Sequence, residues 1–141
     1  MVQNAWISIC GTQDIGSGEP HQLELVTEGS YCYEPGYAKI TYEETEVTGL
    51  EGVITSFAVE DGCRVTLSRT GKLNSSMTFI RGERHESLYD AGFAVLMVSV
   101  KTRSMTVLLN ENGGVLDLEY EVEIEHEYCG TNSYHIQIRT N

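Results

Sequence analysis

The sequence predicts an all-β protein, built as a single antiparallel, mostly meandering β-barrel. Three observations lead to this fold class. Apolar and polar side chains alternate with a period of two along most of the chain, turn signals rich in glycine separate the alternating runs, and no run has the spacing of an amphipathic helix. The length of 141 residues fits one domain, so we expect residues 1–141 to form one barrel domain.

Five strands are expected in the first half of the chain. Turn signals at Pro35-Gly36 and Asp61-Gly62 bound them, and the fifth strand carries Val65 and Leu67 between polar neighbours. The early loop from Gln13 to Pro20 is the segment expected to be disordered. The expected strands are 2–10, 21–33, 37–43, 50–60 and 63–70.

Six further strands are expected in the second half. Met77 and Phe79 share one face of the first of these, and the run from Phe93 to Val98 is apolar on both faces. Short connections favour pairing between sequence neighbours, and so many strands must close into a barrel or form a sandwich to avoid long open edges. Several strands are long, which favours the barrel. The expected strands are 75–81, 86–90, 93–101, 104–110, 114–127 and 132–140.

Charge and cysteine usage limit the classes of partner and environment. The chain has 21 acidic and 9 basic residues, a net charge of −12, and such a surface repels nucleic acid and anionic lipid. We therefore expect no nucleic-acid and no membrane partner, and the chain has no apolar run of the ~18 residues that a membrane helix needs. The start of the chain shows no signal-peptide pattern, so we expect a cytoplasmic protein with four free thiols at Cys10, Cys32, Cys63 and Cys129.

The segment from Arg81 to Asp90, RGERHESLYD, is the most charged part of the chain and invites a catalytic interpretation. His85 is the candidate general base. Nothing near it in the sequence supplies a nucleophile in a known arrangement, and charges at the tip of a hairpin are normally solvated. We therefore interpret the segment as a turn leading into a strand, and expect no catalytic residue.

His126 and His135 flank one expected hairpin and are the candidates for a metal site. Matching the apolar faces pairs Ile124 with Ile136 and places the turn at Cys129-Gly130-Thr131. Glu125 then faces His135, Glu121 faces Arg139, and His126 turns to the opposite, apolar face. The acidic row from Asp117 to Glu127 is expected to be a solvated outer face, because carboxylates along one strand lie ~7 Å apart. We expect neither a metal site nor a cofactor.

Two longer segments resemble a known family. RTGKLNSSMTFIRG, from Arg69 to Gly82, and SLYDAGFAVLMVSVKT, from Ser87 to Thr102, are similar to the YwiB-like family of Gram-positive bacteria, and Thr27-Glu28-Gly29 with its following tyrosines fits too. The resemblance implies a cytoplasmic β-barrel of calycin (lipocalin-like) type. It brings no catalytic residues with it.

The preferred functional hypothesis is a non-catalytic barrel that binds a small ligand inside the barrel or at its mouth. Arg69 sits late in its strand and could hold a carboxylate or phosphate, or else close one barrel end by pairing with an acid. Tyrosines suit a ligand pocket but also pack well in strands. The alternative function is a protein–protein interaction module with a filled barrel. The candidate ligand-binding residues are Arg69, Arg81, Tyr31, Tyr33, Tyr42 and Tyr89.

Overall fold

The computed structural model describes residues 2–14, 21–46, 49–90 and 92–141, and these form ten antiparallel strands. The fold class expected from the sequence is confirmed. The strands are β1 (Val2–Asp14), β2 (His21–Glu34), β3 (Tyr37–Glu43), β4 (Val53–Glu60), β5 (Arg64–Gly71), β6 (Ser75–Ile80), β7 (Arg84–Asp90), β8 (Val95–Asn110), β9 (Gly113–Ile124) and β10 (Glu127–Thr140).

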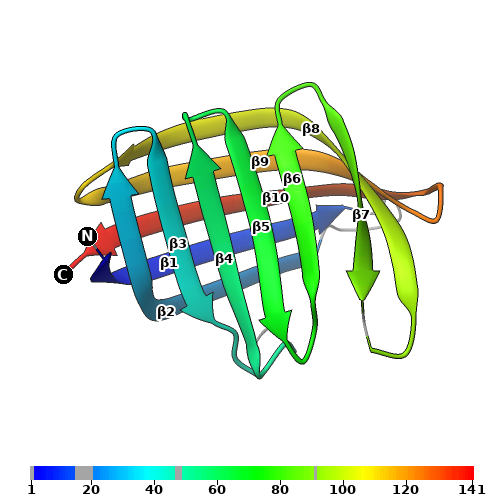
Figure 1. Ribbon diagram of the computed structural model, residues 1–141, viewed down its shortest axis with the longest axis horizontal. Coiled ribbons are helices and arrows are strands. Elements are labelled where there is room, and N and C mark those ends of the chain that lie inside the picture. The colour runs from blue at the N-terminus through cyan, green and yellow to red at the C-terminus, as the bar shows by residue number, and fades with distance from the viewer. Residues whose placement is uncertain (1, 15–20, 47–48, 91) are drawn as a thin grey trace.

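The strands follow one another as a meander, and the two ends of the chain meet in the sheet because β1 pairs with β10. The resulting order is β6-β5-β4-β3-β2-β1-β10-β9-β8-β7. The longer strands β8, β9, β10 and β1 cross behind the shorter strands β3 to β6 (Figure 1). The sheet curls until its edge strands β6 and β7 meet, and single bridges join Asn74 to Asp90 of β7 and Arg81 to Thr102 of β8. The barrel is therefore nearly closed.

The interior of the barrel is packed with side chains from all around the sheet. Alternate residues of each strand point inward, and Tyr31, Phe57, Phe79 and Leu116 are among the largest that are fully buried. Their burial removes apolar surface from water, which supplies the main stabilisation of such a fold. Any ligand site must therefore lie toward an end of the barrel rather than in its middle.

Two local irregularities let long strands turn the corners of the barrel. At Gly29 of β2, an added Cβ would lie 2.3 Å from the carbonyl oxygen of Thr41, so only glycine allows β3 to approach this closely. On β8 the pairing with β9 shifts between Thr102 and Ser104, a β-bulge. The two strands expected at 93–101 and 104–110 are thus one bulged strand, since a bulge bends a strand without ending it.

The expected register of the last hairpin is wrong. The turn is the pair Glu125-His126, with φ angles of 51° and 68°, and Ile124 pairs with Glu127. Such left-handed pairs make the two-residue turns that suit twisted strands. The carboxylate of Glu125 accepts a hydrogen bond of 2.8 Å from the backbone N–H of Met97, which holds a turn that lacks the usual glycine.

The pairings that depended on this register are wrong as well. His135 faces Asp117 instead of Glu125, and Glu121 faces Thr131 instead of Arg139. His126 lies in the exposed turn and not on the apolar face. The prediction of which side chains face inward is nevertheless correct for most of the hairpin, because Leu116 and Leu118 are buried while Asp117 and Glu119 are not. The error was a slip of even length along the strand, which keeps each side chain on its face.

At the first hairpin, β1 is longer than expected. Gln13 and Asp14, which were expected in a disordered loop, pair with His21 and Thr131 respectively, and the remaining residues of that loop, 15–20, lie outside the described residues.

Within the described residues, no helix has the length and apolar character needed to cross a membrane.

Candidate functional site

One end of the barrel contains a small cavity of about 90 Å³ beside a buried charge. Two rows of cross-strand neighbours face each other there. Tyr42, Thr55 and Arg69 are direct partners across β3, β4 and β5, while Leu23, Gly11 and Tyr134 are direct partners across β2, β1 and β10. The residues that line the cavity are Ile9, Gly11, Leu23, Leu25, Tyr42, Glu44, Leu50, Arg69 and Tyr134.

Arg69 is the cation of this site. It follows Val65 and Leu67 on the inward face of β5, and its side chain is only 13% exposed. Its Nη2 donates a hydrogen bond of 3.1 Å to the hydroxyl of Tyr134, whereas its buried Nε has no hydrogen-bond partner. Burial alone would lower the pKa of Arg69, but the neighbouring Tyr134, Tyr42 and Glu44 outweigh burial, so the pKa is raised and the guanidinium is charged.

Glu44 supplies the opposite charge. Its side chain is 2% exposed, and one of its oxygens, Oε2, lies 4.0 Å from Nε of Arg69. The hydroxyl of Thr55 donates to the same oxygen at 2.5 Å, and the hydroxyl of Tyr42 also forms a hydrogen bond with this carboxylate. Burial, followed by the charge of Glu44, raises the pKa of Tyr42 far above its ordinary value. Two neutral hydroxyl groups thus donate to this carboxylate, while Nε of Arg69 has no hydrogen-bond partner within the described residues.

Aromatic side chains form the other wall of the site. The ring of Tyr134 meets Phe57 edge to face, with ring centroids 5.5 Å apart, and stacks on Tyr120 at 6.3 Å. Tyr120 forms hydrogen bonds with Asn132 and Tyr134, and burial raises its pKa well above the ordinary value. A hydrogen-bonded chain thus runs from Asn132 through both tyrosines to Arg69, and it fixes where the guanidinium lies.

An open groove lies next to the cavity. Gly11, Leu23 and Tyr134 line both spaces, and the groove has a volume of about 340 Å³. A Cβ added at Gly11 would lie 3.7 Å from the ring of Tyr134, an ordinary contact, so the glycine is not required by the backbone. Its missing side chain leaves the space between the two rows open.

Of the six ligand-binding candidates from the sequence, Arg69 and Tyr42 come together at this cavity. Tyr31 is buried in the core, where its hydroxyl donates to the carbonyl of Asn110 at 2.6 Å, and burial raises its pKa to about 12. Tyr33 lines a separate groove with Tyr37, at the other end of β3 from Tyr42.

The remaining two candidates lie on strands away from the cavity lining. Tyr89 is half-buried on β7, where it pairs with Leu96 and packs against the core. Arg81 is exposed, and its Nη2 donates to the carbonyl of Met105 at 2.6 Å. Neither residue lines the cavity beside Arg69.

Glu44 and Tyr134 were missed as site residues, although the sequence carries a signal for Glu44. Period-two alternation from Ile40 and Tyr42 places Glu44 on the inward face, as it places Arg69 inward after Leu67. In a meander, β3 and β5 run in the same direction, so the ends of both strands meet at one end of the barrel. An acid and a base on inward faces at that end are an expected pair.

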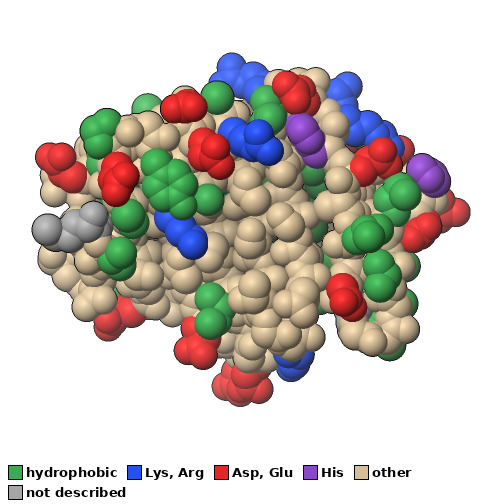
Figure 2. Space-filling view, viewed as in Figure 1, with side chains coloured by type: hydrophobic (Ala, Val, Ile, Leu, Met, Phe, Trp, Pro, Cys, Tyr) green, Lys and Arg blue, Asp and Glu red, His purple; other side chains and the backbone are tan. Residues whose placement is uncertain are grey.

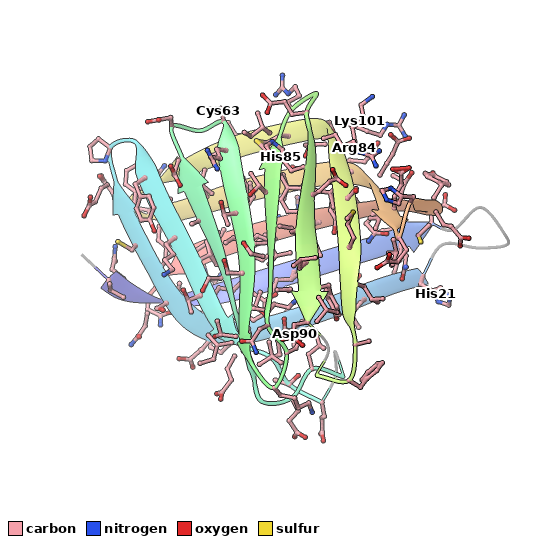
Figure 3. The ribbon with its side chains drawn as sticks, turned by 45° about the vertical axis from the view of Figure 1, so that its right-hand side comes forward. His21, Cys63, Arg84, His85, Asp90 and Lys101 are labelled. Carbon is pink, nitrogen blue, oxygen red and sulfur yellow. The ribbon has the colours of Figure 1, made fainter. Side chains whose placement is uncertain are left out.

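The charged segment from Arg81 to Asp90 is a turn followed by β7, as the sequence predicted. Arg84, His85 and Lys101 lie together near the upper end of the edge strands, away from Asp90 at the lower end (Figure 3). Nε2 of His85 lies 3.0 Å from Glu83, and Arg84 forms an ion pair with Glu123. These contacts are those of a charged outer surface.

The two histidines considered as metal ligands have different surroundings. His135 bonds to Asp117, and His126 is in the exposed turn. In the part of the chain that the structure describes, no group of three or more His, Cys, Asp or Glu side chains is placed to hold a metal ion.

Cys10, Cys32, Cys63 and Cys129 are free thiols. On the face shown in Figure 2, charges of both signs lie mostly around the edges.

Comparison with known proteins identifies the family. The chain is similar in structure to the ywiB protein from Bacillus subtilis, with a TM-score of 0.80 and 18% sequence identity over 99% of this chain and 93% of that chain. No curated protein matches the sequence. The family described as "Domain of unknown function (DUF1934)" matches residues 7–136, and the YwiB-like resemblance seen in the sequence is confirmed. The chain therefore belongs to the DUF1934 family.

Proposed function

We propose that this protein is a non-catalytic β-barrel that binds a small molecule at one end, in the cavity beside Arg69. The observation that carries the proposal is the guanidinium of Arg69. The Arg69 side chain is mostly buried, it lines a cavity, and its buried Nε has no hydrogen-bond partner among the described residues. Burying a charge without complete hydrogen bonding costs free energy, and a ligand that accepts a hydrogen bond from Nε would offset this cost.

The packing of the barrel restricts where the ligand sits. Core side chains fill the middle, so the ligand lies at the mouth, between the row of Arg69 and the row of Tyr134. Typical pockets for drug-sized ligands are roughly 300–1,000 Å³, and the cavity of about 90 Å³ is much smaller. The ligand, or the part of it that enters, is therefore a group of a few atoms.

A thermal-shift screen tests this function. The protein is heated with a library of small metabolites, and hits are repeated with Arg69→Lys and with Arg64→Lys, an exposed arginine on the same strand. We expect hits that raise the melting temperature of the native protein and of Arg64→Lys but not of Arg69→Lys. A library without hits, or hits that do not depend on Arg69, would contradict the proposal.

The alternative function, an interaction module, is favoured by one observation on the outer surface. A groove of about 610 Å³ runs over β1, β2, β9 and β10, where Trp6, Val26 and Val115 form an apolar lining. Apolar grooves on an outer face are typical of protein contacts. Sedimentation velocity of the native chain and of Trp6→Ser tests whether this groove joins two copies. Self-association that Trp6→Ser abolishes supports this function, and a monomer at every concentration shows that the groove does not join two copies.

A further inference from the structure

The charges at the proposed ligand site sum to zero, and this determines the class of ligand. We propose that the cavity selects a small molecule without net charge that presents a hydrogen-bond acceptor to Arg69 and a donor to Glu44, as a primary amide does. The inference rests on the proposed function. Its basis is the separation of 4.0 Å between Nε of Arg69 and Oε2 of Glu44, which is too long for a hydrogen bond.

A charged ligand is disfavoured by the same pair. An anion that approaches Arg69 also comes close to the carboxylate of Glu44, whose side chain is 2% exposed. A cation that approaches Glu44 meets the guanidinium in the same way. Either charged ligand leaves one charge of the site uncompensated. Because the site holds little solvent, this uncompensated charge costs more free energy than it would in water. A neutral molecule adds no net charge and supplies the hydrogen bonds that the pair does not make within itself.

The shape of the cavity favours a compact head with a short apolar tail. Its volume of about 90 Å³ corresponds to only a few waters at roughly 30 Å³ each. Around the polar pair, the walls are the side chains of Ile9, Leu25 and Leu50. A planar amide can turn its oxygen to the guanidinium and its nitrogen to the carboxylate, and a short alkyl chain can contact these walls.

Three molecules of the same size test the proposal, because they differ mainly in charge. Propionamide is neutral, propionate is an anion and propionamidinium is a cation, and all three have the same number of non-hydrogen atoms. Each is titrated into ¹⁵N-labelled protein while the side-chain Nε–H resonance of Arg69 is followed by NMR. The resonance is assigned by its loss in Arg69→Lys. We expect propionamide to bind at least about tenfold more tightly than either ion, with affinities on the order of millimolar for so few atoms.

Changing the charge of the site should change the preference. Glu44→Gln keeps a side-chain oxygen for Thr55 and Tyr42 but leaves the site positive, so propionate should become the preferred ligand. Arg69→Gln leaves the site negative and should favour propionamidinium, followed through backbone amides of β5. The matched controls are Glu43→Gln, at the exposed residue directly before Glu44, and Arg64→Gln, at an exposed arginine of β5, and both should keep the preference for propionamide.

The outcomes separate this inference from the function on which it rests. Tighter binding of propionate or propionamidinium by the native protein overturns the neutral-ligand inference but leaves a ligand site at Arg69. If none of the three binds, the test uses the compounds from the thermal-shift screen whose binding depends on Arg69. Charged compounds among these hits would overturn the inference. If no compound affects Arg69, the proposed function falls as well. If Glu44→Gln or Arg69→Gln does not fold, the order of the three affinities in the native protein still tests the inference.

Discussion

Arg69 on β5 and Tyr134 on β10 meet across the barrel, with Nη2 of the arginine donating to the tyrosine hydroxyl at 3.1 Å. These residues are 65 positions apart in the sequence. Their contact joins the two sides of the barrel end and orients the guanidinium beside the cavity.

Filling the space beside Gly11 should remove ligand binding without harming the fold. In Gly11→Val the new Cβ makes an ordinary contact with the ring of Tyr134, and the branched methyl groups extend into the cavity. Valine suits strands better than glycine, so the free energy of unfolding should stay equal or rise by up to about 1 kcal/mol. Urea unfolding and the thermal-shift hits measure the two effects.

Gly29→Ala is the contrasting variant, because its Cβ would lie 2.3 Å from the carbonyl oxygen of Thr41. We expect it to lose about 2 kcal/mol or more, as buried overpacking does. If both glycine variants lose stability alike, the description of the space at Gly11 is wrong.

Removing one charge of the buried pair should destabilise the protein more than removing both. Arg69→Met removes the neighbouring cation while the carboxylate of Glu44 stays buried, and we expect a loss of about 2–3 kcal/mol. Adding Glu44→Gln to Arg69→Met should restore at least half of that loss. A double-mutant cycle by urea unfolding measures the coupling. Additive losses would show that the two side chains do not interact.

Stability should fall at alkaline pH because of the buried tyrosines. The pKa of Tyr31 is raised from 10.0 to about 12, mainly by burial, and that of Tyr42 is raised further. A folded-state pKa above the unfolded value means that this contribution is fully present below pH 10 and is lost as the pH rises through the folded pKa. Urea midpoints at about pH 8 and about pH 11 measure the loss.

Two tyrosine variants identify the source of the alkaline effect. Tyr42→Phe should show a smaller drop between the two pH values than the native chain, since it has one fewer buried hydroxyl to ionise. Tyr128→Phe, at an exposed tyrosine of β10, should show the native drop. An unchanged drop in Tyr42→Phe would mean that Tyr42 does not carry the effect.

The turn between β9 and β10 should be improved by glycine. His126 has a φ of 68°, a conformation that costs a residue with a side chain about 1–2 kcal/mol. His126→Gly should therefore stabilise the protein by about 0.5–1 kcal/mol after the entropy cost of glycine. His21→Gly, an exposed histidine in β2, should instead destabilise it by a similar amount. Equal destabilisation by both would contradict the turn assignment.

Much of the architecture can be predicted from the sequence, because period-two alternation reports which face of a strand is buried. It identified the faces of β5 and β9 and placed Arg69 at a barrel end. It did not locate the turn at Glu125-His126, since neither residue is typical of such turns and the stabilising contact comes from Met97, far away in the sequence. Gly130, which suggested the turn, lies instead at a β-bulge with a φ of 124°.

The candidate site was predicted only in part. Arg69 was identified because it sits late in its strand, and Tyr42 because tyrosine suits a ligand pocket. The position of Tyr134 beside them depends on the closure of the sheet between β1 and β10 and on the register there, which pairs Tyr134 with Gly11. Local patterns do not encode such a long-range pairing, so the site becomes visible only once the barrel is closed.

The most direct test of a ligand site at Arg69 is the Nε–H resonance of this residue during titration with hits from the metabolite screen. We expect this resonance to shift and saturate with the ligand in the native protein, and not to move in Gly11→Val, where the cavity is filled. A resonance that stays in place while a ligand binds elsewhere, or that moves equally in Gly11→Val, would contradict a ligand site at Arg69.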